Sequence, residues 1–207
     1  MLAAASRCAG PEDRHWYVLT DHQQWSSSPL NLPHAPEAWY QLGAAGGWQA
    51  LVADTSHPVA HDVVSARCEG HGGLTAAWCS LPFSVPVLCT AATGQAVHAL
   101  QTAVSAAAAD GLPLQRMVLA VVAVSEGRIP APVRAAITML QDRVSSVVMV
   151  PFDPHIRAHG MTQVARLKPR TLGAGTQLAH RILDSLHSMW GDPLPPAPVP
   201  ALAPSTD

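Results

Sequence analysis

Charge is scarce in this sequence, and several informative signals are missing from it. Charged residues make up 13% of the 207 residues and the formal net charge is −2, so bulk charge does not predict a nucleic-acid surface. The four cysteines form no CxxC pair, which argues against a disulfide scaffold and favours a reduced, cytoplasmic setting. No apolar run approaches the roughly 20 residues of a membrane span. The first residues also lack the basic start of a signal peptide.

What is abundant is apolar residue, at 48% of the chain. That is ample for a buried core in a chain of this length. We expect residues 1–14 to be a flexible lead-in and residues 15–190 to form one domain. The composition changes sharply after that, because residues 191–207 read GDPLPPAPVPALAPSTD. Such a proline-rich segment is predicted to be an extended, disordered tail.

A strand–helix–strand pattern over residues 117–150 is the clearest structural signal. Residues 117–124 and 147–150 are β-branched runs almost free of charge, as in strands that are covered on both faces. Between them, Val133, Ile137 and Leu140 recur at helical spacing. Such a unit predicts two parallel strands joined by a right-handed crossover. In parallel sheets, the loops at the carboxyl ends of the strands build the ligand site.

Similar patterns on either side extend this unit to a larger fold. Thr93 is predicted to cap a long alanine-rich helix, and residues 155–171 are expected to be a loop. We expect strands at residues 15–20, 49–53 and 85–91, and helices at 37–42, 59–68, 75–80, 93–109 and 172–190, the last with Leu178, Ile182, Leu186 and Met189 on one face. The predicted fold class is α/β, a three-layer, mainly parallel sheet with helices on both faces.

Two predicted strands end in residues that could bind a ligand. Asp54 and Thr55 follow the strand at residues 49–53, and a carboxylate beside a hydroxyl at such a place can hold magnesium through water. The alternative is an aspartate that caps the next helix. Pro151, Phe152 and Asp153 follow the strand at 147–150. They could present backbone groups to a base or ring, or form a rigid turn, because proline fixes φ and restricts its predecessor.

The order of these segments resembles the later part of ParA/MinD-like ATPases, the deviant-Walker P-loop family. The resemblance lies within residues 15–190 and is carried by WQALVADTSHP, VPVLCTAATGQAVHAL, QRMVLAVVAV, VVMVPFDPHIRAHG and LKPRTLGAGTQLAHRIL. It implies a P-loop NTPase-like fold with ATP and Mg²⁺ as ligands. By the same resemblance, Asp54 would lie at the metal with Thr55 beside it, and Pro151 and Asp153 would lie by the base.

The phosphate loop of that family is missing from this sequence. There is no G-x-x-x-x-G-K-[ST] motif, Lys168 is the single lysine, and the glycine-rich residues 43–47 contain no cation that could reach the β- and γ-phosphates. Ser125 and Glu126 stand where the family often has asparagine. The family's central strand would be lost with that loop, so its neighbours would either expose unpaired edges or close up around the gap. A protein partner or a homodimer could cover them.

The resemblance therefore implies two functions. In the first, the chain is a degenerate or truncated member that acts by protein–protein interaction or regulation, in a partitioning or positioning process. In the second, it is a truncated piece of a dimeric ATPase that binds and hydrolyses ATP. Whether this chain is an enzyme is left open. If it is one, the resemblance implies that it hydrolyses ATP.

Two further clusters are candidates for binding. Basic residues precede the last predicted helix and could contact phosphates or DNA, or form a solvated loop; they are Arg157, Arg166, Lys168 and Arg170. His57 and His61 stand four residues apart and, with Cys68, could bind zinc in a small hydrolase. Scattered polar histidines are the alternative, because no glutamate follows His57 as a general base.

Overall fold

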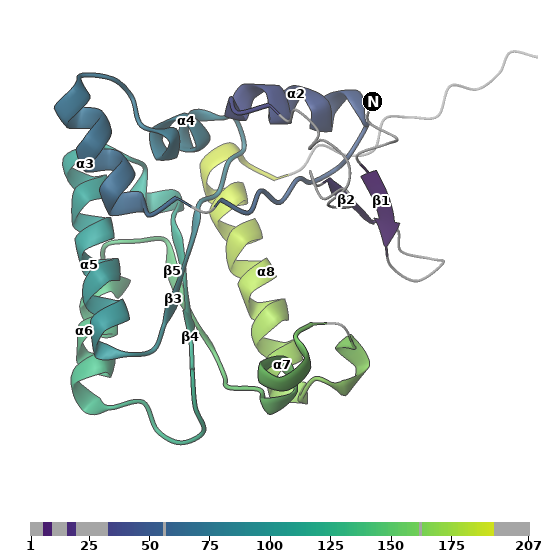
Figure 1. The fold of residues 1–207 in the computed structure, drawn as a ribbon, viewed down its shortest axis with the longest axis vertical. Coiled ribbons are helices and arrows are strands. Elements are labelled where there is room, and N and C mark those ends of the chain that lie inside the picture. The colour runs from purple at the N-terminus through teal and green to yellow at the C-terminus, as the bar shows by residue number, and fades with distance from the viewer. Residues whose placement is uncertain (1–5, 10–15, 20–32, 56, 162, 193–207) are drawn as a thin grey trace, which may run out of the picture. The chain divides into compact units, whose positions relative to one another are not determined.

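The structure is a computed structural model, and it describes residues 6–9, 16–19, 33–55, 57–161 and 163–192 (Figure 1). The chain divides into two compact units, residues 1–53 and residues 54–207. The domain predicted over residues 15–190 extends across both. The predicted lead-in at 1–14 and the predicted tail at 191–207 lie largely outside the described residues.

The N-terminal unit contains a small antiparallel sheet and one helix. β1 (Ser6–Ala9) pairs with β2 (Trp16–Leu19). The strand predicted at residues 15–20 is therefore confirmed, and β1 lies within the predicted lead-in. α2 (Pro36–Ala45) contains the helix predicted at residues 37–42. Its proline lies in the first turn, where a missing N–H leaves no intrahelical bond unmade.

Residues 49–53 do not form the predicted strand. The segment from residue 50 to residue 55 has no regular secondary structure, and Val52 exposes 96% of its surface. An apolar run becomes a strand only when a neighbouring backbone pairs with its N–H and C=O groups. No segment in the described part of the chain does so here, so the side-chain pattern alone was misleading.

The C-terminal unit is built on a three-stranded parallel sheet in the order β3-β4-β5. Its strands are β3 (Val87–Ala91), β4 (Val118–Val122) and β5 (Ser146–Val150), which confirms the three runs predicted from the sequence. β4 lies between the other two strands. Its residues 118–121 expose at most 2% of their surface, as expected for an apolar run without charge.

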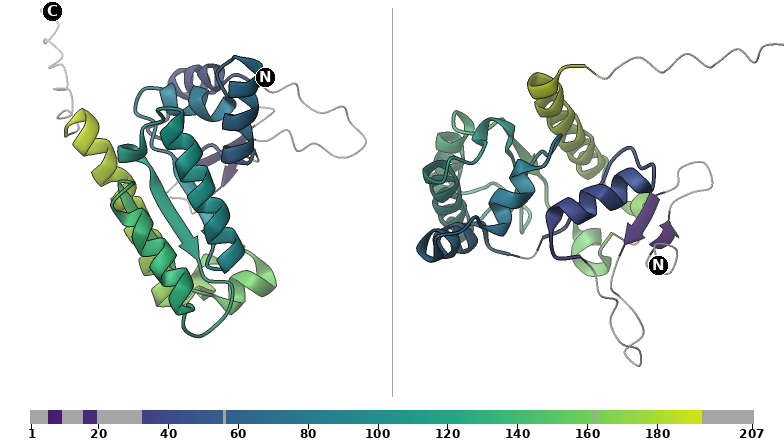
Figure 2. Two further views of the ribbon diagram at one scale, coloured as in Figure 1. Left: turned by 90° about the vertical axis from the view of Figure 1, so that its left-hand side faces the viewer. Right: turned by 90° about the horizontal axis from the view of Figure 1, so that it is seen from above.

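Helices lie on both faces of this sheet, which confirms the α/β class (Figures 1 and 2). α5 (Gly94–Ala109) and α6 (Ala131–Gln141) are the crossovers and pack on one face, and α8 (Pro169–Trp190) packs against β4 and β5 on the other. α3 (Val59–Glu69) packs against α5 and against α4 (Leu74–Ser80). The Thr93 hydroxyl accepts the N–H of Ala96 at 3.3 Å, so the predicted cap of α5 is confirmed.

Two apolar clusters join the crossover helices to the sheet. Leu119 packs in one cluster with Leu100 and Val104 of α5. Val121 packs in the other with Ile137 of α6. Each such side chain contributes about 1.5–3 kcal/mol by leaving water, so the packing of β4 against its two crossovers stabilises this unit.

The region after β5 differs from the prediction. Residues 155–171 were expected to be a loop, but α7 (Pro154–His159), a 3₁₀ turn, η2 (Val164–Arg166), and the first residues of α8 lie there. On α8, Met189 is 50% exposed although it was predicted on the buried face, whereas Ala174 and Ser185 are buried. Small side chains let this helix approach the sheet closely. None of the described helices is both long enough and apolar enough to cross a membrane.

Candidate functional site at the carboxyl end of the sheet

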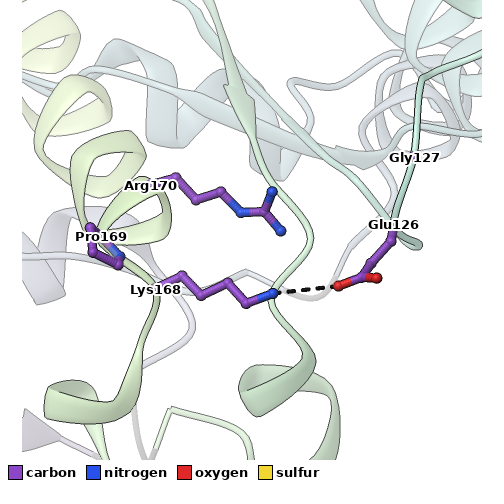
Figure 3. Close-up of a pocket in the computed structure, with 5 residues that line it drawn as sticks. All are labelled: Glu126, Gly127, Lys168, Pro169 and Arg170. Atoms are coloured by element: carbon purple, nitrogen blue, oxygen red, sulfur yellow. Dashed lines mark hydrogen bonds and ion pairs between the residues drawn. The ribbon is translucent and has the colours of Figure 1, made fainter.

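A cavity of about 650 Å³ lies where loops from the carboxyl end of the sheet meet the start of α8 (Figure 3). It is open to solvent and is lined by Glu126, Gly127, Lys168, Pro169 and Arg170. The first two residues belong to the loop after β4, and the last three open α8. The site therefore has the position expected for a ligand site in a parallel sheet.

Two cations and one carboxylate set the charge of this cavity. The ammonium Nζ of Lys168 lies 3.4 Å from Oε1 of Glu126, and the side chains of Lys168 and Arg170 both point toward the Glu126 loop (Figure 3). Arg170 donates from Nη2 to the Phe152 carbonyl at 3.1 Å. Lysine has three donors and arginine five, so both cations retain donors for an anion.

Asp153 is a structural anchor beside this cavity. Its side chain is 4% exposed. Oδ1 accepts the N–H of His155 at 2.9 Å, and Oδ2 accepts the N–H of Lys168 at 2.9 Å and the Thr171 hydroxyl at 2.8 Å. The carboxylate therefore ties the start of α7 to the start of α8. Of the two interpretations left open by the sequence, this geometry favours the rigid turn.

The hydrogen bonds to Asp153 keep it ionised. The N–H of Lys168 lowers its pKa most, burial opposes that change, and the Thr171 hydroxyl and the N–H groups of His155 and Ile156 lower it further, to about 2. Both carboxylate oxygens are occupied by donors from the chain itself. Pro151, two residues earlier, is half-buried at the end of β5.

Asp54 and Thr55 are exposed and lie in the irregular segment that precedes α3. Neither residue lines the cavity. Desolvation raises the pKa of the Cys89 thiol in β3, and the Asp54 carboxylate raises it further. Mg²⁺ usually keeps several waters and takes one or two carboxylates together with substrate phosphates. Asp54 offers one exposed carboxylate, so the magnesium site at Asp54 and Thr55 stays a prediction.

Two of the four basic residues predicted as a cluster, Arg157 and Arg170, contact Phe152. The Arg157 guanidinium lies 5.9 Å from the centre of the Phe152 ring, and Arg170 binds its carbonyl. Lys168 is paired with Glu126, and Arg166 lies in η2. Their positive charge is partly neutralised and partly used to hold the loop after β5.

The histidines considered for zinc have other partners. His57 Nε2 lies 2.9 Å from the Thr75 hydroxyl, and His61 Nδ1 lies 3.3 Å from the Ser65 hydroxyl. Cys68 is exposed at the end of α3. Among the residues that the structure describes, no three His, Cys, Asp or Glu side chains come close enough together to hold a metal.

Asp62 is a second carboxylate that binds the chain's own backbone. It accepts the N–H groups of Leu74 and Thr75 at 3.0 and 2.7 Å, and so caps α4 from α3. Burial opposes its ionisation, but hydrogen bonds from Thr75 and Leu74 outweigh that effect and lower its pKa. A methyl group on Gly73 would meet Oδ2 of Asp62 at 2.7 Å, so glycine is needed there.

Glu126 and Gly127 were not recognised as site residues from the sequence. Their position after β4 is a usable signal, because loops at the carboxyl ends of parallel strands face the ligand. Glu126 and Lys168 are 42 residues apart in the sequence, so no local sequence pattern predicts that they pair. Gly127 has φ 105°, a conformation that glycine adopts readily.

Comparisons with models of known protein families, with curated proteins and with solved structures find no match for this chain.

Proposed function

We propose that this protein is a ParA/MinD-like α/β domain without a phosphate loop of its own, and that it acts by binding another protein chain. A partitioning or positioning process in the cytoplasm is the setting that the sequence resemblance suggests. We also propose that the sheet and its helices form the three-layer arrangement of P-loop NTPase-like folds. The observation that carries the proposed binding is the free edge of β3.

In the described part of the chain, β3 pairs with β4 and with no other strand. Its sequence is Val-Leu-Cys-Thr-Ala, which contains no charge and no proline, and Cys89 at its centre is exposed. Edge strands that face solvent are usually protected by lysine, proline or a bulge. An unprotected edge presents N–H and C=O groups that an extended strand of another chain can pair with.

The loops at the carboxyl end of the sheet support the same interpretation. A phosphate cradle needs clustered backbone N–H groups together with a cation that reaches the terminal phosphates. The described loop after β4 contains one glycine and has Arg128 but no lysine. In the loop after β5, the Asp153 carboxylate accepts N–H groups at the starts of α7 and α8. Neither loop supplies such a cradle.

The test is self-association of the full chain, with a second copy as the first partner examined. We expect sedimentation velocity to show concentration-dependent dimers that Cys89→Lys weakens, because a lysine on an edge strand opposes pairing. Ala99→Lys, at an exposed position of α5, is the matched control and should dimerise normally. A monomer at every concentration would remove the homodimer.

A nucleotide-binding function is the second candidate, favoured by the cavity that Lys168 and Arg170 line. Its volume lies within the range of small-molecule sites, roughly 300–1,000 Å³. Calorimetric titration with ATP and Mg²⁺ tests it, with Lys168→Gln and Asp54→Ala as variants. Binding that both variants weaken would favour the ATPase alternative over the interaction domain. No heat at millimolar nucleotide would support the proposal.

A further inference from the structure

The turn before β3 holds an aromatic ring on the surface in an unfavourable backbone conformation. Phe83 has φ 57° and is the one non-glycine residue with positive φ among those the structure describes. It occupies the third position of the turn at residues 81–84, which the Ser84 N–H closes by donating to the Leu81 carbonyl at 3.3 Å. Glycine fits that position without steric cost, yet a phenylalanine that is 58% exposed stands there.

Phe83 is part of a fixed aromatic surface. Its ring centre lies 5.4 Å from that of Trp190 at the end of α8, with 47° between the ring planes. The Arg116 guanidinium lies over the Trp190 ring, 5.0 Å from its centre. Arg116 also donates to the Cys79 carbonyl. We call Phe83, Trp190 and Arg116 the aromatic patch. Arg116 ends the 3₁₀ turn η1 (Leu114–Arg116) that precedes β4, Trp190 ends α8, and Phe83 lies in the turn after α4.

The chemistry of this patch fits a proline-rich segment. A polyproline II helix has no internal hydrogen bonds, so its carbonyls remain free to accept. The Trp190 indole and the Arg116 guanidinium are donors that such carbonyls can use. Aromatic-lined grooves bind these helices at small entropic cost because the ligand is already extended. A polyproline II helix rises about 3.1 Å per residue. Three of its residues are therefore longer than the 5.4 Å between the two ring centres.

Such a segment follows the patch in the sequence. Residues 193–204 read PLPPAPVPALAP and begin three positions beyond Trp190. Gly191 ends α8 with φ 85°, so the chain changes direction directly after the helix. We propose that residues 193–204 of this chain bind its own aromatic patch, as an intramolecular ligand in the polyproline II conformation. This inference is independent of the function proposed for the β3 edge.

Amide NMR of the full chain tests the proposal. The probes are the indole N–H of Trp190 and the backbone amides of Leu194 and Val199, compared with a synthetic peptide of residues 191–207. We expect the tail amides of the full chain to resonate away from their free-peptide positions. In Phe83→Gly they should return to those positions, although the fold keeps or gains thermal stability because glycine relieves the positive φ.

Two further variants make the result decisive. Pro195→Ala combined with Pro196→Ala changes only the tail and should shift the Trp190 indole signal, whereas Met139→Ala, at an exposed site on α6, should change neither probe. Tail amides that coincide with the free peptide in the wild-type chain would overturn the proposal. Shifts that vanish on dilution would also overturn it, because they would mean that the tail of a second copy is bound.

Discussion

The two ends of the parallel sheet differ in how much their notable side chains are exposed. At the carboxyl end, the Asp153 carboxylate is buried and accepts donors from α7 and α8. At the amino end, Arg116 packs on the Trp190 ring and Trp190 contacts Phe83. The Phe83 ring is exposed and its residue has a positive φ. A carboxylate after a strand is therefore a weak indication of a ligand site, since local backbone donors can use it fully. A strained, exposed ring is harder to explain by folding alone.

A charge buried in β4, the central strand, should have the largest effect on stability. Val121→Asp places an unpaired charge at a position with no exposed surface, which costs several kcal/mol or more. We expect the C-terminal unit to unfold, as measured by circular dichroism and the loss of a cooperative melt. Val124→Asp, where the side chain is 46% exposed, is the control. A soluble, cooperatively melting Val121→Asp would contradict the packing of β4.

The anchor at the carboxyl end should be the next in size. Asp153→Asn removes an ionised helix cap and weakens three hydrogen bonds, so Tm should fall by roughly 4–8 °C. Asp142→Asn, at an exposed aspartate after α6, should leave Tm nearly unchanged. An unaltered Tm for Asp153→Asn would show that the carboxylate does not hold α7 and α8 together.

The pH dependence of stability gives the same anchor a separate signature. The pKa of Asp153 is about 2 in the fold, against 3.8 for a free side chain. Its contribution is therefore complete above about pH 4 and is lost as the pH falls toward 2. Wild type and Asp153→Asn should converge in Tm across that interval. Parallel curves down to pH 2 would contradict the lowered pKa.

The corresponding tie at the amino end should be weaker. Arg116→Met keeps the apolar stem but loses the hydrogen bond to Cys79 and the contact with Trp190. We expect a loss of about 1–2 kcal/mol in the free energy of unfolding, measured by urea titration. A loss much larger than that from Asp153→Asn would reverse the comparison between the two ends.

The ion pair of the cavity should contribute least. Lys168 and Glu126 expose 38% and 68% of their side chains, and such pairs contribute about 0–1 kcal/mol. Lys168→Gln should therefore change the free energy of unfolding by less than about 0.5 kcal/mol. If the same variant abolishes binding of an anion, Lys168 serves the cavity and not the fold.

The sequence predicts the elements that depend on local signals. Apolar β-branched runs indicate β3, β4 and β5. Thr93 marks the start of α5 because a hydroxyl at that position accepts an N–H group of the first helical turn. The strand expected at residues 49–53 fails because a strand also needs a partner, which no local pattern provides. Met189 was placed on the buried face because helical periodicity does not tell which neighbours require small side chains.

The site is less predictable than the fold for the same reason. Lys168 and Arg170 are visible as a basic cluster, but the pairing with Glu126 depends on how two distant loops meet. The turn at residues 81–84 carries a visible signal in Pro82, which suits its second position. Phenylalanine at the third position would ordinarily be assigned to the core. The structure instead gives it a φ of 57° and a residue surface that is 58% exposed.

The sheet order β3-β4-β5 has a consequence for how this unit folds and opens. Each strand pairs with the next one along the chain, and the paired residues lie 31 and 28 positions apart. Only moderate loop closures are therefore needed, which favours rapid assembly for a parallel sheet. β4 has partners on both sides within the described chain, so its amides should exchange with solvent only in global opening. Those of β3 can exchange by fraying at the edge.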